Sequence, residues 1–190
     1  MPAKSTLRNM VLCLSVVCLV CSAVLGGAYA ITAEPIAAAQ VAKTNASIAK
    51  VLPPFSGNAL SDTVTVDGVA YPYYKAEGAG YAVISASNGF SGPVTVMVGI
   101  TEDGIIHNTT VLSQSETPGL GAKCQTDEKF INQFKGWDPA AKSLTVKKDG
   151  GDVDAITAST ITSRAYSLAV SNAVAAYKAI VSNDGGQENE

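Results

Sequence analysis

The sequence of 190 residues has little charge, one histidine and one tryptophan. Charged residues make up 15% of it and the formal net charge is −3, so no basic surplus is available to neutralise nucleic-acid phosphates. One histidine, His107, and one cysteine outside an apolar N-terminal run, Cys124, fall short of a zinc ligand set. Because no nucleophile-elbow motif surrounds a serine, a hydrolase also has little support. These absences exclude a nucleic-acid binder and predict no metal site.

The longest uncharged stretch is the segment 10–31, MVLCLSVVCLVCSAVLGGAYAI. An α-helix of this length, rising about 1.5 Å per residue, covers a hydrocarbon core of about 30 Å. Lys4 and Arg8 precede the segment, and Glu34 is the first charge after it. The positive-inside rule therefore predicts a transmembrane helix at 10–31, with residues 1–9 in the cytoplasm and the rest of the chain on the outer side of the membrane.

A cleaved signal peptide is the competing interpretation of the same segment. Ala28-Tyr29-Ala30 has the small-x-small form of a cleavage site. The apolar run, however, exceeds the usual signal-peptide core of about 7–15 residues, which favours an uncleaved anchor. Both interpretations place the following domain outside the cytoplasm.

The remainder of the chain predicts an α+β domain over 55–182, with an antiparallel sheet and flanking helices. The Ala-rich residues 32–54 are expected to form a stem that ends at Val51-Leu52-Pro53-Pro54, since a residue before proline leaves the helical region. Alternating valines in 93–100 are typical of a strand. Further strands are expected at 63–66, 82–86, 105–112 and 143–147, helices at 123–134 and 163–182, and a flexible tail at 183–190.

A cluster of hydroxyl side chains lies where the last helix is expected to start. Five hydroxyls fall within the seven residues 157–163, in the segment DAITASTITS. A helix start presents unpaired N–H groups and the positive end of the macrodipole, which together favour a phosphate. From composition alone, plain N-capping by Ser159 or Thr160 is the favoured explanation, because such clusters commonly open helices.

A second motif is the loop Glu116-Thr117-Pro118-Gly119-Leu120-Gly121. Proline followed by glycine suits the two central positions of a type II turn. Two glycines allow the backbone to approach a flat ligand, and Glu116 and Thr117 add polar groups beside the turn. By itself such a loop is a weak signal.

Taken together, three segments resemble the FMN-binding domain family found in the G subunit of the Rnf electron transport complex and in its relative, the C subunit of the sodium-pumping NADH:quinone oxidoreductase. Segment 87–100, SNGFSGPVTVMVGI, resembles the family's strand entry. Segment 115–123, SETPGLGAK, resembles its Glu-Thr-Pro-Gly-Leu-Gly loop and is the most specific match. Segment 154–160, DAITAST, is similar to its flavinylation motif, whose last hydroxyl carries FMN through a phosphodiester bond.

The resemblance implies an electron-transfer subunit with covalent FMN and without a complete active site of its own. Its expected setting is a membrane-bound ferredoxin:NAD oxidoreductase coupled to sodium or proton translocation, with neighbouring membrane subunits and a flavin transferase as partners. By position, Thr160 bears the FMN phosphate. The other residues of the implied site are Thr157, Ala158 and Ser159 around the phosphate, and Glu116, Thr117, Gly119 and Leu120 along the flavin ring.

The sequence departs from the family pattern at two positions, where Ala158 replaces the common glycine and Ser159 the common alanine. Ser159 thereby adds a second hydroxyl beside the expected attachment residue. This altered pair leaves open a rival interpretation, a membrane-anchored binding or scaffold subunit without redox function. The corresponding subunit of a sodium-pumping NADH:quinone oxidoreductase is a further alternative.

Overall fold

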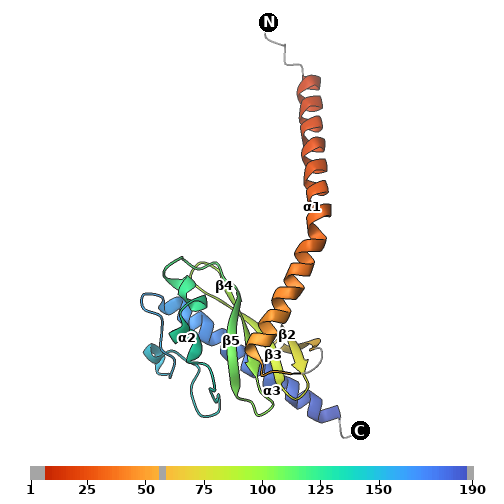
Figure 1. Cartoon of the computed structure of the whole chain (residues 1–190). Helices are drawn as coiled ribbons and strands as arrows, with labels where there is room; N and C mark the ends of the chain where they lie inside the picture. Colours follow the sequence, from red (N-terminus) through yellow and green to blue (C-terminus); the bar gives the residue numbers. More distant parts are fainter. Residues whose placement is uncertain (1–6, 56–58, 188–190) are drawn as a thin grey trace. The chain divides into compact units, whose positions relative to one another are not determined.

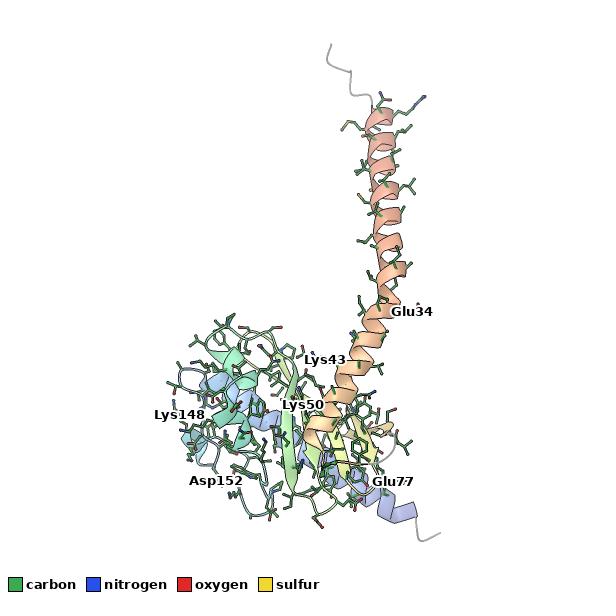
Figure 2. The ribbon with its side chains drawn as sticks, viewed as in Figure 1. Glu34, Lys43, Lys50, Glu77, Lys148 and Asp152 are labelled. Carbon is green, nitrogen blue, oxygen red and sulfur yellow. The ribbon has the colours of Figure 1, made fainter. Side chains whose placement is uncertain are left out.

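The computed structural model describes residues 7–55 and 59–187, so the predicted cytoplasmic charge Lys4 lies outside the described residues. The chain divides into two compact units, with the boundary between Lys43 and Thr44. Helix α1 extends over Leu7–Val51 with Pro35 inside it, and it is long and apolar enough to cross a membrane. Figure 2 labels Glu34, the first acidic residue after the apolar run. The helix ends at Val51, within the segment 51–54 where the prolines predicted the end of the stem.

The second unit is built on one antiparallel sheet of five strands in the order β1-β2-β3-β4-β5 (Figure 1). Each strand pairs with the next one along the chain. This sequential order needs only short connections, as the glycine-containing turns of the sequence predict. The strands are β1 Leu60–Val66, β2 Val69–Ala76, β3 Gly80–Asn88, β4 Pro93–Ile100 and β5 Ile106–Ser113.

Both faces of the sheet are covered. The long helix α3, Thr160–Gln187, contacts β1, β3 and β4 (Figure 1). Its buried residues belong to the same hydrophobic core as the valines of β4. On the other face, Ile48 and Val51 from the end of α1 pack with Met97 of β4. The α+β class with flanking helices is thus confirmed. The last residues of the expected stem, however, belong to the core of the folded domain.

The expected strand at 143–147 is wrong. Only Val146 makes a bridge, to Val153, and a short 3₁₀ helix, η2 Lys147–Asp149, follows it directly. The chain turns back at Gly150, so the backbone of this segment bonds to the returning residues 151–153 and not to the sheet. Local β-propensity does not produce a strand where no neighbouring strand is within reach.

The expected helix at 123–134 is split into two short elements, the 3₁₀ helix η1 Gly121–Gln125 and the helix α2 Glu128–Asn132. Asp127 causes the break, because its side chain accepts hydrogen bonds from the N–H groups of Lys129 and Phe130 and starts a new helix. At the other end of the domain, α3 continues through part of the expected tail to Gln187.

Candidate functional site

The two motifs singled out in the sequence meet at one cavity. It has a volume of about 380 Å³ and is lined by three segments: the β3–β4 loop, the loop after β5, and the first turn of α3 with the residues just before it. This size is typical of small-molecule sites. The lining residues are Phe90, Glu116, Thr117, Leu120, Gly121, Ala158, Ser159, Thr160, Ile161 and Thr162.

Glu116 holds these three segments together. It is only 5% exposed, and its carboxylate accepts hydrogen bonds from the Ser91 N–H at 2.9 Å and the Thr162 hydroxyl at 2.5 Å. Gly121 leaves room for it, since a Cβ there would lie 2.5 Å from Glu116 Oε2. The same carboxylate adds to the burial that raises the pKa of Cys124 to about 11, so this thiol remains neutral. The side chain of Glu116 therefore positions the walls of the cavity.

The Pro118–Gly119 turn has the geometry predicted from its sequence. The Leu120 N–H donates to the Thr117 carbonyl at 3.2 Å, and Gly119 has a φ of 77°, as the third position of a type II turn requires. Leu120 follows directly and is 44% exposed on the cavity wall. The turn thus presents an apolar side chain to the cavity.

Replacing Gly119 by valine is expected to lower the free energy of unfolding by about 1–2 kcal/mol, because a β-branched residue is strained at positive φ. A Cβ at this position would meet no atom within 4 Å, so the cost comes from the backbone alone. Urea denaturation measures it. The matched variant is Gly119→Asn. Asparagine tolerates this conformation, so its free energy of unfolding should fall by less than that of the valine variant. Equal stability of the valine variant and the wild type would contradict the prediction.

The start of α3 does not use the expected cap. Ser159 directly precedes the helix and its carbonyl accepts the first helical bond from the Ser163 N–H at 3.0 Å. Its hydroxyl is nevertheless buried without a hydrogen-bond partner, although it lines the cavity. Thr160 is the first helical residue and is half-buried. Buried hydroxyls without partners are rare, and this one is left available to a ligand group in the cavity.

Ala158 has a backbone conformation that favours glycine, the residue that the resemblance implies at this position. Its φ is 61°, in the left-handed region that side chains with a Cβ adopt at a cost. The conformation turns the chain between Ile156 and the helix start, where the Ser159 N–H donates to the Ile156 carbonyl at 3.0 Å. Alanine is tolerated here, and the turn forms in spite of the departure from the family pattern.

The variant Ala158→Gly is expected to raise the melting temperature by about 3 °C, because it removes roughly 1 kcal/mol of backbone strain. The greater freedom of glycine in the unfolded chain offsets part of the gain. Ala155→Gly serves as control, since Ala155 has no positive φ and its replacement should lower the melting temperature. Differential scanning calorimetry measures both, and a less stable Ala158→Gly protein would contradict the strain argument.

Of the residues expected at the site, the cavity brings together Glu116, Thr117, Leu120, Ala158, Ser159 and Thr160. Thr157 is exposed and Gly119 shapes the turn, and neither is part of the lining. The sequence pattern assigned no role to Phe90 or Ile161, and it named Gly121 only as one of the two loop glycines and Thr162 only as a member of the hydroxyl cluster. For Phe90 a signal existed, since it lies in the matched segment 87–100. The others depend on which residues face each other in space.

The site is consistent with a flat aromatic ligand that carries a phosphate. Phe90, Leu120 and Ile161 are exposed apolar side chains around the cavity, with exposed fractions of 70%, 44% and 49%. The buried Ser159 hydroxyl and the start of a 28-residue helix supply the polar end. Fold and site therefore define a ligand-binding domain of the flavin mononucleotide type, and residues 89–175 match the model of the FMN-binding domain family.

Comparison with known proteins extends this assignment. The chain is 32% identical over 167 residues to the G subunit of the proton-translocating ferredoxin:NAD(+) oxidoreductase complex of Clostridium ljungdahlii, covering 85% of this chain and 86% of that protein. It is 43% identical over 90 residues to the G subunit of the ion-translocating oxidoreductase complex of Erwinia tasmaniensis, covering 45% of this chain. The protein thus belongs to the family of G subunits of ion-translocating oxidoreductase complexes, whose FMN-binding domain it carries.

The share of each relative's own length that the match spans differs from one relative to another. The match spans 43% of the Erwinia protein and 53% of the corresponding G subunit of Shewanella baltica, about half the length of each. Among solved structures, the C subunit of the Na(+)-translocating NADH-quinone reductase of Parabacteroides distasonis has a TM-score of 0.48 and 23% identity, over 67% of this chain and 77% of that one.

Proposed function

We propose that this protein is the electron-transfer subunit of an ion-translocating ferredoxin:NAD oxidoreductase and that it carries FMN covalently on Thr160. The observation that supports the attachment residue is the position of Thr160 at the head of α3, on the cavity that also contains the 116–121 loop. Ser159, its neighbour, is buried at 7% exposure, whereas Thr160 is half-buried and more accessible to a transferase. Thr157 lies outside the lining.

Attachment requires a flavin transferase and a flavin nucleotide donor. Thr160 Oγ1 forms a bond to the phosphorus of the donor, the bond from that phosphorus to the rest of the donor nucleotide breaks, and the hydroxyl proton passes to the departing group. The product is a phosphodiester with one negative charge. The N-terminal end of α3, whose first N–H groups have no partners within the helix, stabilises that charge.

FMN supplies one-electron chemistry when bound, and the chain's own residues position it. Leu120, Ile161 and Phe90 offer apolar surface to the ring, and Glu116 fixes the segments that carry them. No general acid or base is needed for electron transfer, so the protein has no complete active site of its own. Electrons pass between redox centres of neighbouring subunits of the complex.

The proposed location is the cell membrane, with one span formed by the apolar part of α1 and the FMN domain on the outer side. There a covalent link has a clear advantage, because a cofactor released outside the cell would be lost by diffusion. Coupling of the complex to sodium or proton movement is the role proposed for the whole assembly, as the names of the relatives indicate.

The proposal is tested by producing the protein with and without a flavin transferase. We expect a yellow protein whose fluorescence stays with its band on a denaturing gel only when the transferase is present. Peptide mass mapping of residues 151–164 then locates the flavin. A colourless protein made with the transferase present would contradict the proposal and favour the non-redox scaffold.

A further inference from the structure

A lysine that the sequence motifs do not include lies beside the proposed attachment residue. Lys148 Nζ donates a hydrogen bond to Thr160 Oγ1 at 3.2 Å. The lysine comes from η2, twelve residues earlier in the chain. It is exposed and is labelled in Figure 2. The ammonium group is therefore next to the oxygen on which the phosphate would be carried.

The two sequence neighbours of Lys148, Lys147 and Asp149, bind η2 to residues before and within α3. Lys147 forms an ion pair with Asp154, which precedes the α3 turn, at 2.8 Å. Asp149 accepts two hydrogen bonds from Arg164 of α3 at 2.6 and 2.7 Å. Such a paired arrangement of guanidinium and carboxylate is directional as well as attractive. The three consecutive residues 147–149 thus contact three different residues around the start of α3. The pairs of Lys147 and Asp149 hold η2 on either side of Lys148 and so position it.

The pair between Asp149 and Arg164 is complete at neutral pH. Arg164 lowers the pKa of the Asp149 carboxyl below its usual value of 3.8, so the pair is complete above that pH and is lost as the pH falls through the lowered pKa. Lys148 differs from its neighbours, because its hydrogen bond goes to a neutral hydroxyl. Among the described residues no ion pair joins it to an acidic side chain. A fixed positive charge is thus directed at Thr160.

We propose that Lys148 is a phosphate-positioning residue, which binds the FMN phosphate during its transfer to Thr160 and in the finished phosphodiester. The inference rests on the proposed covalent FMN. The ammonium group offsets the negative charge of the phosphate, together with the α3 N-terminus. The buried Ser159 hydroxyl, which has no partner, offers a further donor on the cavity side.

The experiment measures the rate of flavin incorporation into the full chain, by intact mass, with purified flavin transferase and a flavin nucleotide donor. Lys148→Ala is expected to slow incorporation about tenfold, the loss of one charge-assisted hydrogen bond. Lys148→Arg should restore most of the rate, because it keeps the charge. Lys135→Ala, at another exposed lysine, is the matched control and should leave the rate unchanged.

Two further measurements separate positioning from mere stability. The salt dependence of the rate should weaken in Lys148→Ala and in Lys148→Met, while the melting temperature stays near that of the wild type. Asp149→Asn should slow incorporation by a smaller factor and add nothing in the Lys148→Ala background. Wild-type rates and salt dependence in Lys148→Ala and in Lys148→Met would overturn the inference. Failure of the wild type itself to take up flavin would instead overturn the proposed function.

Discussion

Replacing Thr160 by alanine is expected to abolish the proposed covalent flavin and to leave the domain folded. The expected loss is complete, because the variant has no oxygen at this position to which phosphorus can bond. The Thr160 hydroxyl makes one hydrogen bond, to the exposed Lys148, so its removal should change the free energy of unfolding by less than about 1 kcal/mol. Intact mass of protein matured with its transferase should correspond to the bare polypeptide.

Two neighbouring hydroxyls are the controls for this variant. Thr157→Ala and Ser159→Ala should both retain an adduct with the mass of one FMN minus one water. Ser159→Ala should also be as stable as the wild type, because the hydroxyl that it removes is buried without a partner. A full adduct in Thr160→Ala would move the bond to Ser159 or Thr157 and contradict the assigned residue.

The second large effect is expected at Glu116. Glu116→Ala should lower the free energy of unfolding by about 3 kcal/mol, because the Ser91 N–H and the buried Thr162 hydroxyl lose their partner and a cavity remains. The three walls of the ligand cavity should then separate, so flavin incorporation should also fall. Urea denaturation and intact mass measure the two effects.

Glu116→Gln separates the contribution of the side chain's shape and hydrogen bonds to stability from that of its negative charge. The glutamine amide can accept from the Ser91 N–H with its oxygen and donate to Thr162 Oγ1 with its nitrogen, so it should lose only about 1 kcal/mol. Glu77→Ala, at an exposed acidic residue of the same domain, is the control and should be near neutral. Equal stability of Glu116→Ala and Glu77→Ala would refute a structural role of the buried carboxylate.

Patterns that depend on neighbours in the chain were predictable from the sequence. The alternation of valines in 93–100 defined β4, and the prolines after Leu52 ended α1 at Val51. The Pro118-Gly119 pair predicted its turn, with the positive φ that the structure shows. Each of these features follows from steric rules that act over a few residues, so no knowledge of the fold was needed.

Segments whose structure depends on distant partners were predicted less well. The segment 143–147 has strand-forming residues but no neighbouring strand, and Asp127 divides the expected helix at 123–134. The carboxylate of Glu116 was expected to border a ligand. Its main interactions are with Ser91 and Thr162, which are 25 and 46 residues away in the sequence.

The sequence by itself determined an apolar helix, an α+β domain and the three motifs that carry the family resemblance. Only the tertiary structure decided that these motifs share one cavity, that Glu116 joins its walls, and that Lys148 lies at Thr160. The physical reason is the range of the interactions. Turns and periodicities are set by local sterics, whereas a buried carboxylate or a directed lysine finds its partner only after the chain has folded.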